Sequence, residues 1–369
     1  MQEDAGCLMH AQGSPRANEA ALTRQRAFTL FLDTYAEARR SVQFVRFHQG
    51  DAELIAPSLY AGRGNVGDYL SHLGVREVVR LPGLELFAGR PGSRELARTV
   101  TAHHFRERYR VLVIGGGGLF QGCFDDFWRI VLASRLPYVV FGVGANKLGG
   151  QRSVTDASLL ADIVRGATYI QVRDTMTREA IRSCGVEEEI PLGLCPATSY
   201  VYPRYWLDDR SSRATLLHVV HPSDLRMAQG DLGRIGENLR AQARELELSY
   251  VEEDNMSARL GGVLGRYAGA RLVVSSRLHG CIISYAMGIP FVPLRCDEKI
   301  EAFLQTHFPS RTTVEVQALH ERDACRDVLR GTLETFGTEY RGDLEREVRR
   351  NRERGAKIRE DIVAKALAR

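Results

Sequence analysis

Residues 110–145 read RVLVIGGGGLFQGCFDDFWRIVLASRLPYVVFGVGA, in which two short apolar runs flank a mixed segment. The runs RVLVIGG and PYVVFGVGA show no alternation of polar and apolar residues, which is typical of strands buried on both faces. The segment between them, near residues 124–134, has the length and pattern of a helix. A strand, a helix and a second strand in this order predict a parallel βαβ unit, because parallel strands need a crossover connection.

The same alternation of strand and helix patterns continues on both sides of this unit. Upstream there is a helical pattern up to about residue 43, then strand patterns in ELIAPSLY and REVVRL, then a helical pattern over about 93–108. Downstream, helices are predicted near 156–165 and 175–184, with TYIQV and EIPLGLC as strands. The Pro- and Tyr-rich residues 196–213 break the rhythm, which predicts an interdomain linker.

A second alternating series runs from ATLLHVV through ELSYV and ARLVV to IPFVPL, and a charged helical segment follows it. We therefore predict an α/β fold with two Rossmann-like domains whose parallel sheets face a cleft. The predicted parts are an N-terminal tail and helix (1–45), a first domain (46–198), a linker (199–213), a second domain (214–325) and a C-terminal helical segment (326–369).

Composition and charge narrow the range of functions. A hydrophobic content of 44% and a charged content of 26% are those of a soluble globular protein. The net charge of +4 demands no polyanionic partner, and no basic stripe is interleaved with aromatic residues, so we do not expect nucleic-acid binding. The basic excess is compatible with a phosphorylated substrate or with an anionic membrane surface.

Cysteine usage and the lack of an apolar span predict a cytoplasmic protein. The seven cysteines include no CxxC pair, which is typical of a reduced protein and provides no metal-ligand spacing. No stretch reaches the ~20 apolar residues of a membrane-spanning helix. The N-terminus starts acidic and lacks the apolar core of a signal peptide.

Ligands of open α/β sheets bind beyond the carboxyl ends of the strands, so the loops at these ends are the candidate site. Gly116, Gly117 and Gly118 follow a strand directly, and consecutive glycines let the backbone approach a ligand. The helix after them offers N–H groups to an anion, while a tight turn required for packing is the alternative. The loop fits neither GxGxxG nor GxxxxGKS/T, which disfavours a dinucleotide site and a P-loop.

Two loops contain polar residues that have ordinary explanations. In GRGNVGD, Asn65 and Asp68 flank a glycine, and either side chain could cap the following helix. In LRCDEKIEAF, Asp297 and Lys299 open a helix, where capping and surface charge account for them. Neither loop predicts a site on its own.

The stretch YIQVRDTMTREAI places an arginine at the end of a buried strand. Asp174 or Thr175 is expected to cap the helix that follows. For Arg173 two explanations stay open. Its guanidinium can fork onto a carboxylate or phosphate of a ligand, or it forms a structural salt bridge with Asp174 or Glu179.

The stretch VVSSRLHGCIISYAMGIPFVPL, residues 273–294, places polar residues between two strongly apolar segments. Ser275, Ser276, Arg277 and His279 lie where a strand ends and a helix begins, an arrangement that suits an anion. A histidine two places after an arginine at such a turn favours a functional role over that of a polar residue satisfied within the fold.

Taken in order along the chain, these loops resemble the polysaccharide pyruvyltransferase family. The family's motifs are GNxGD, a GGG loop after a strand, VRD before a helix, and SxRLHG followed by GxP and a lysine. They are matched by residues 64–68, 115–118, 172–174 and 275–280, with Gly288, Pro290 and Lys299, over roughly residues 60–305. Each motif is short, but the ordered set is specific. The resemblance implies a GT-B-like architecture in which a C-terminal helix crosses back onto the first domain.

The resemblance also implies chemistry. Such enzymes transfer pyruvate from phosphoenolpyruvate to a pair of sugar hydroxyls in a cell-surface glycan precursor, which forms a ketal and releases phosphate. By this likeness Arg173 and Arg277 hold the phosphate and carboxylate of the donor, and His279 acts in acid–base catalysis next to Arg277. The further substrate-binding candidates are Asn65, Asp68, Gly116, Gly117, Gly118, Ser275, Ser276 and Lys299. No metal, and no cofactor beyond the donor substrate, is expected.

Two features depart from the family pattern. Where relatives tend to have an aspartate and a proline after the sixth strand, this chain has GLCPA, with Cys195 in the acidic position. The segment before about residue 50 has no counterpart that we can place. Both leave the acceptor open, for which a lipid-linked sugar, a polymer and a small metabolite are all candidates.

Two other functions and several uses of the C-terminal helix stay open. A GT-B glycosyltransferase would hold a nucleotide diphosphate against Arg277 and a ribose on Asp297 or Glu298, whereas a non-catalytic protein would only bind a phosphorylated metabolite.

The C-terminal helix either crosses back or docks on the inner face of an anionic membrane. Its basic residues are Arg346, Arg349, Arg350, Arg352 and Arg354. Interleaved glutamates favour a solvated charged face.

Overall fold

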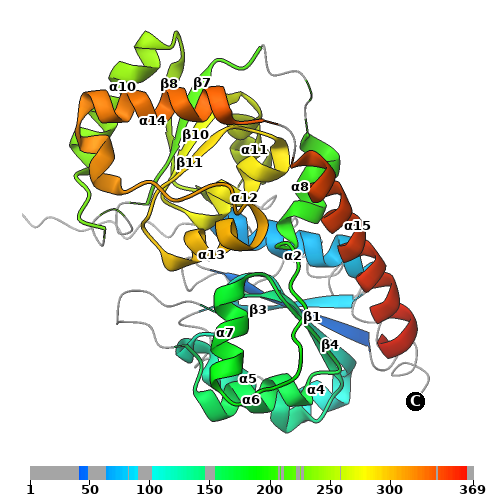
Figure 1. The fold of residues 1–369 in the computed structure, drawn as a ribbon. Coiled ribbons are helices and arrows are strands. Elements are labelled where there is room, and N and C mark those ends of the chain that lie inside the picture. Colours follow the sequence, from blue (N-terminus) through cyan, green and yellow to red (C-terminus); the bar gives the residue numbers. More distant parts are fainter. Residues whose placement is uncertain are drawn as a thin grey trace, which may run out of the picture.

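The computed structural model describes residues 41–48, 64–81, 83–89, 102–145, 154–206, 208, 212–221, 225, 228–257, 259–337 and 340–363. In this part of the chain two parallel sheets form two Rossmann-like domains, and the last helix runs from the second domain back over the first (Figure 1). The predicted α/β, GT-B-like fold class is thus confirmed. The N-terminal helical pattern before residue 41 and the ELIAPSLY pattern lie outside the described residues.

The first sheet has five parallel strands in the order β3-β1-β4-β5-β6. Its strands are β1 (Ser41–His48), β3 (Gly83–Gly89), β4 (Tyr109–Gly115), β5 (Tyr138–Val143) and β6 (Tyr169–Val172). β4 and β5 are buried almost along their whole length, as the two non-alternating apolar runs predicted. Helix α5 (Asp125–Ser134) connects them after a 3₁₀ turn (Gly122–Phe124), which confirms the βαβ unit.

Helices cover both faces of this sheet. On β4, Leu112 and Ile114 join the core formed with α4 (Ala102–Arg108), α5, α6 (Ala157–Gly166) and α7 (Thr175–Ser183). Val111 and Val113 point to the opposite face, because successive side chains of a strand alternate, and pack there with valines of α2 (Val66–Val79).

One sequence prediction was wrong at helix α2. The REVVRL pattern favoured a strand, but the first four of its six residues, 76–79, form the end of this helix. Val75, Val78 and Val79 recur at helical spacing and are buried against the sheet. Short apolar runs do not distinguish a strand from a buried helix by periodicity alone. In the same way, residues 41–43 had a helical pattern but begin β1.

The second sheet has four parallel strands in the order β11-β10-β7-β8. They are β7 (Thr215–Val219), β8 (Ser249–Glu253), β10 (Ala270–Ser275) and β11 (Phe291–Pro293). Around them lie α10 (Leu232–Glu245), α11 (Leu260–Ala268), α12 (Leu278–Met287), α13 (Glu298–His307), a 3₁₀ turn (Val316–His320) and α14 (Arg322–Thr335). One face packs on α10 and α14 and the other on α11, α12 and α13.

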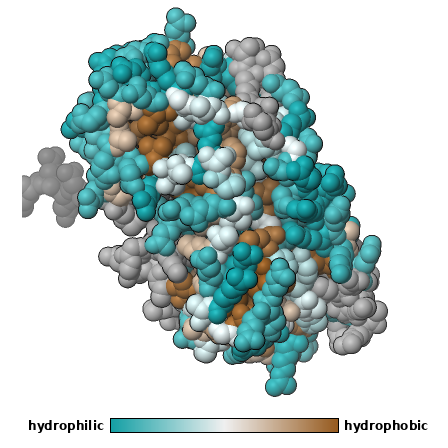
Figure 2. Space-filling model, viewed as in Figure 1, coloured by the Kyte–Doolittle hydropathy of each residue, from teal (hydrophilic) through white to brown (hydrophobic). Residues whose placement is uncertain are grey.

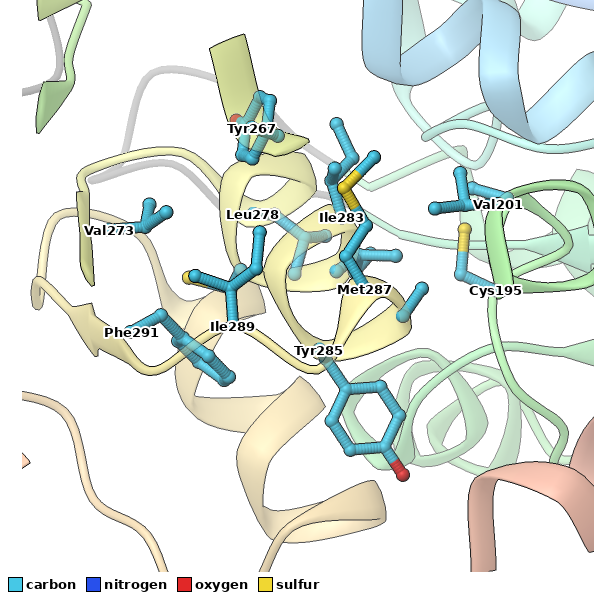
Figure 3. Packing of buried hydrophobic residues seen from close by; sticks show 14 of the residues in the cluster. Cys195, Val201, Tyr267, Val273, Leu278, Ile283, Tyr285, Met287, Ile289 and Phe291 are labelled. Atoms are coloured by element: carbon cyan, nitrogen blue, oxygen red, sulfur yellow. The ribbon is translucent and has the colours of Figure 1, made fainter. Parts of the chain in front are cut away.

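The two domains share a buried core. The Pro- and Tyr-rich stretch predicted as a linker contains helix α8 (Ala197–Tyr205), which packs on both α2 and α12. Figure 3 shows Ile283 and Met287 of α12 on the side that faces Val201 and Cys195. The first domain therefore contributes directly to the hydrophobic core of the second.

A short antiparallel pair also joins the domains at the start of α2. β2 (Gly64–Asn65) pairs with β9 (Met256–Ser257), which follows β8. Next to this pair, Val66 N donates a hydrogen bond to Asn255 O at 2.9 Å. Both contacts hold the N-terminus of α2 at the carboxyl ends of the second sheet.

Helix α15 (Arg341–Lys357), continued by a π-helical turn (Ile358–Val363), crosses back onto the first domain as predicted (Figure 1). Gln171 Nε2 of β6 donates to Asn351 Oδ1 at 3.2 Å, and Arg354 Nη1 donates to Gln171 Oε1 at 3.1 Å. Because Gln171 and Asn351 are buried, these hydrogen bonds fix the position of α15 on the sheet.

The exposed face of α15 has charges of both signs. Its ion pairs include Arg346–Asp343, Arg350–Glu347 and Arg349–Glu353. The surface over α15 is largely hydrophilic (Figure 2). Such a helix fits the solvated interpretation better than a basic membrane-docking face. Within the described ranges, no helix is long and apolar enough to cross a bilayer.

We predict that Gly355→Ala lowers the free energy of unfolding by about 1–3 kcal/mol, the usual cost of overpacking. A Cβ at Gly355 would lie 2.2 Å from Val78 O, so α15 must shift away from α2. Urea unfolding measures this effect. Gly331→Ala in α14 is the matched control, because a Cβ there meets nothing within 4 Å and alanine favours the helix by roughly 1 kcal/mol. Equal effects of the two substitutions would contradict the tight contact.

Candidate active site

The N-terminus of α2 is built by the GNVGD loop. Asn65 caps the helix, since its Oδ1 accepts a hydrogen bond from Gly67 N at 3.0 Å. Asp68 lies in the first turn and is buried. A Cβ at Gly67 would lie 2.1 Å from Cγ of His279, so only glycine allows the imidazole to approach this helix. The loop therefore brings α2 into contact with the second domain's histidine.

The turn between β10 and α12 positions that histidine. Ser275 Oγ accepts a hydrogen bond from Arg277 N at 3.1 Å, and Ser276 Oγ accepts one from His221 N at 3.3 Å. A Cβ at Gly280 would lie 2.0 Å from Ser275 Oγ, so the helix also needs glycine at this point. The two buried hydroxyls hold the turn and thereby present Arg277 and His279 toward the first domain.

His279 is 8% exposed, and both of its ring nitrogens face α2. Its Nε2 lies 3.1 Å from Ser71 Oγ, and its Nδ1 lies 3.9 Å from Asp68 Oδ1. Burial lowers the pKa of His279 well below its usual range, and nearby positive charges lower it further. The imidazole is therefore neutral at neutral pH and can accept a proton.

Three cations act on His279: Arg173, Lys299 and Arg277, in order of decreasing effect on its pKa. Arg173 is 4% exposed, and its Nε donates to Asp174 Oδ2 at 3.2 Å. Its Nη1 is buried and has no hydrogen-bond partner among the residues that the structure describes. Arg173 thus forms the salt bridge expected of a structural residue and still has a donor left for a ligand.

The other two cations differ in how they are held. Arg277 Nη1 donates to Asp254 O at 2.6 Å, a neutral carbonyl, so this contact does not neutralise its charge. Lys299 Nζ pairs with Asp297 Oδ2 at 2.8 Å, and Asp297 also caps α13. Arg277 is thus the cation of the three whose described contact is not with a carboxylate, and Arg173 provides the unused donor.

The glycine loop after β4, residues 115–118, packs against α2, the helix that His279 also contacts. Gly116 and Gly117 have φ angles of 76° and 73°, which only glycine adopts without strain. A Cβ at Gly116 would lie 2.5 Å from Ser71 Cβ, and Gly118 O accepts a hydrogen bond from Gln121 Nε2 at 2.7 Å. The next helix, α5, already has two aspartates in its first turn, which disfavours an anion there. Packing against Ser71 explains the glycine at 116, and substrate binding by Gly116, Gly117 and Gly118 stays a prediction.

A family model described as "Polysaccharide pyruvyl transferase" matches residues 65–298, from the cap of α2 to the first residue of α13. This match covers well over half of the chain and includes Asp68, Arg173, Arg277 and His279. The chain belongs to the polysaccharide pyruvyl transferase family. It is therefore a transferase enzyme of glycan biosynthesis.

Two solved structures resemble this member of the pyruvyl transferase family at low sequence identity. A functionally uncharacterized protein, KP1_0663 from Klebsiella pneumoniae subsp. pneumoniae NTUH-K2044, is 14% identical, with 79% of this chain and 98% of that chain covered and a TM-score of 0.42. The wall teichoic acid polymerase TagF is 10% identical, with 92% and 99% covered and a TM-score of 0.38. No curated protein is similar enough to match the chain.

Three residues of this transferase's site were not predicted as site residues by the sequence. Ser71 lies three residues after Asp68 on the same face of α2, and helical spacing reveals it only once the helix is recognised. Cys195, which stood out only as a departure from the family pattern, lies 3.3 Å from Ser71 Oγ. His307, at the end of α13, has its Nε2 2.9 Å from Arg173 O, so it positions the arginine from the other domain.

Acidification should destabilise the transferase through its buried histidines. Burial lowers the pKa of His218 to about 4 and that of His279 below its usual range, so the unfolded chain binds protons that the folded protein does not. The stability from these groups is complete above the unfolded pKa of ~6.5 and is lost as the pH falls toward the folded pKa, by at most about 1.4 kcal/mol per pH unit and histidine.

Urea unfolding between neutral pH and mildly acidic pH measures this slope. His279→Gln should reduce this slope by the contribution of one histidine, and His218→Gln should reduce it by the contribution of another. An unreduced slope in His279→Gln would mean that the imidazole is not held neutral in the folded enzyme.

Proposed function

We propose that the enzyme transfers pyruvate from phosphoenolpyruvate to a pair of hydroxyls on a sugar, forming a cyclic ketal and releasing phosphate. The observation that supports this most directly is the buried Nη1 of Arg173, which has no hydrogen-bond partner among the described residues, beside a neutral His279. An unpaired guanidinium nitrogen in a buried site costs stability unless a ligand uses it. An anionic substrate provides the partner that the fold lacks.

The donor has two acidic groups, and the site has cations for both. A phosphate accepts hydrogen bonds in a forked geometry from a guanidinium, which suits Arg173. Arg277 has a charge that its carbonyl contact does not neutralise, which suits the donor's carboxylate. Lys299, already paired with Asp297, adds positive potential at the same point.

The chemistry requires that protons move without changing their total number. A net proton passes from the first sugar hydroxyl to the methylene carbon of the donor, the hydroxyl oxygen bonds to the central carbon, and the bond to the phosphate oxygen then breaks. The second hydroxyl replaces the phosphate and gives up its proton to it. A neutral His279 can accept the first proton and, as imidazolium, donate it again.

The nucleotide-sugar alternative finds less support in the geometry. It required Asp297 or Glu298 on a ribose, but the carboxylate of Asp297 accepts from Lys299 N at 3.0 Å and pairs with Lys299 Nζ. Because both contacts occupy Asp297, the ribose-binding role is not proposed. A sugar acceptor agrees with the family, and we leave its identity to experiment.

We place the reaction in the cytoplasm, where phosphoenolpyruvate is a metabolite. The six cysteines of the described residues are all free thiols, as expected in a reducing compartment. A lipid-linked acceptor would bring the enzyme to the inner face of the membrane through its substrate, without a basic face on α15.

A phosphate-release screen tests the proposed function. Phosphoenolpyruvate is mixed with the enzyme and a panel of glycosides that offer hydroxyl pairs, and phosphate is measured against a no-acceptor control. We expect release that depends on the acceptor. Turnover of a nucleotide sugar, or thermal stabilisation by UDP but not by phosphoenolpyruvate, would instead identify a glycosyltransferase.

A further inference from the structure

Two buried polar side chains, Ser71 and Cys195, meet at the Nε2 side of His279. Ser71 Oγ lies 3.1 Å from His279 Nε2 and 3.3 Å from Cys195 Sγ, and Cys195 Sγ lies 4.0 Å from Nε2. Ser71 is fully buried and Cys195 is 1% exposed. The triangle of Ser71, Cys195 and His279 Nε2 lies between the domains, on the side of the ring that faces α2 and α8, and neither Ser71 nor Cys195 belongs to the motifs that suggested the site.

The hydrogen-bonding capacity of Ser71 determines how the triangle is arranged. A hydroxyl donates one hydrogen bond and accepts two. Ser71 Oγ lies 3.0 Å from Gly67 O, which can only accept, so the hydroxyl proton points there. The two remaining sites of Oγ must accept, one from Nε2–H of His279 and one from the thiol of Cys195. All three contacts are then satisfied at once.

The thiol is protonated, as this arrangement requires. Burial raises the pKa of Cys195 above its usual value, and the positive charge of Arg173 only partly opposes this. The sulfur therefore has a proton that it can donate to Ser71 Oγ. Ser71 accepts from the imidazole because its own hydroxyl proton is directed to Gly67 O.

A proton on Nε2 leaves Nδ1 of the neutral ring with a lone pair. Asp68 Oδ1, at 3.9 Å, is too far from Nδ1 for a hydrogen bond but close enough to stabilise a positive charge on the ring. No described residue forms a hydrogen bond with Nδ1. The atom that is left for a substrate is thus Nδ1, on the Asp68 side of the ring.

We propose that Nδ1 of His279 is the atom that accepts the sugar proton, and that Ser71 is the positioning residue that keeps the ring proton on Nε2. This inference rests on the proposed function only in that the hydroxyl belongs to a sugar acceptor. The position of the proton on the His279 ring is inferred independently of that function. In this step the O–H bond of the first hydroxyl breaks and its proton bonds to Nδ1. In the imidazolium, Nε2–H keeps its hydrogen bond to Ser71 Oγ and the Asp68 carboxylate lies beside the new charge, until the proton on Nδ1 passes to the methylene carbon of the donor.

The tautomer is measurable without any substrate. Enzyme labelled with nitrogen-15 histidine gives long-range proton–nitrogen correlations whose pattern distinguishes Nε2–H, Nδ1–H and imidazolium, and His279→Gln identifies the signals of His279. We expect the Nε2–H pattern near neutral pH, and its loss or mixing with the Nδ1–H pattern in Ser71→Ala. An Nδ1–H or imidazolium pattern in the unmodified enzyme would overturn the proposal even if transfer is found.

Kinetics of the same variants form the second test. Ser71→Ala should reduce kcat by about 10- to 100-fold, as expected for one lost hydrogen bond to a charged group, with KM for phosphoenolpyruvate nearly unchanged. Ser284→Ala is the matched control and should change kcat by less than about threefold, because Ser284 is also a buried helical serine that donates to the carbonyl four residues earlier, Gly280 O at 2.7 Å, but has no described contact with the ring. An equal loss in both variants, or no loss in Ser71→Ala, would contradict the assignment. Lack of transfer by the unmodified enzyme would refute only the proposed function, since the tautomer is read separately.

Discussion

Replacement of His279 by alanine is expected to reduce pyruvyl transfer by about 10²–10⁴-fold, the contribution of one positioned acid–base group. The reason is its place in the site. Its neutral imidazole lies between the first turn of α2 and three cations, and no other described histidine contacts both Ser71 and Asp68. The rate of acceptor-dependent phosphate release measures the loss, with the folded fraction determined by urea unfolding.

His218→Gln is the matched control for this variant. His218 is also fully buried and its Nδ1 bonds Tyr250 OH at 2.9 Å, but it lies in the second sheet away from α2. We expect it to lower stability while each folded molecule keeps its turnover. Undiminished transfer by His279→Ala would remove His279 from the mechanism.

Replacement of Arg173 is expected to affect donor binding most strongly. Arg173→Met should lower kcat/KM for phosphoenolpyruvate by about 10²-fold or more, because truncating a buried charge partner costs about 2–5 kcal/mol. Arg173→Lys keeps the positive charge but loses the forked pair of donors of the guanidinium, so we expect a kcat/KM between those of the unmodified enzyme and Arg173→Met. Steady-state kinetics with phosphoenolpyruvate as the varied substrate measures both.

Two controls separate binding from folding in these variants. Asp174 loses its ion-pair partner in Arg173→Met, so urea unfolding must be measured for each protein. Arg182→Met changes an exposed arginine at the other end of α7 and should alter neither kinetics nor stability appreciably. If KM and kcat for phosphoenolpyruvate were unchanged in Arg173→Met, the donor would have to bind elsewhere.

Much of the fold could be predicted because buried parallel strands have a simple signature. The runs RVLVIGG and PYVVFGVGA lack alternation and became β4 and β5. The strand prediction for REVVRL was wrong because Val78 and Val79 suit a strand as well as a buried helix face, and the helix is recognised only when these valines are considered together with the cap at Asn65. β3, with the sequence GLELFAG, was not predicted, because its four apolar residues form neither an unbroken run nor a strict alternation.

The candidate site could be predicted in part, because strand ends converge on one place in such folds. This rule predicted that Arg173, Arg277 and His279 lie near one another, and the charges of both arginines do act on the histidine. It could not find the contacts of Ser71 and Cys195, which depend on the packing of α2 and α8 against α12. Such contacts between distant segments leave no local pattern in a single sequence.

The most direct test of the central claim is the mass of the acceptor product formed with isotopically labelled phosphoenolpyruvate. We predict that the acceptor gains one carboxyethylidene group containing the labelled carbons, with one phosphate released for each ketal and no product from His279→Ala. An acceptor that gains a sugar instead, or label that appears only in free pyruvate, would contradict pyruvyl transfer by this enzyme.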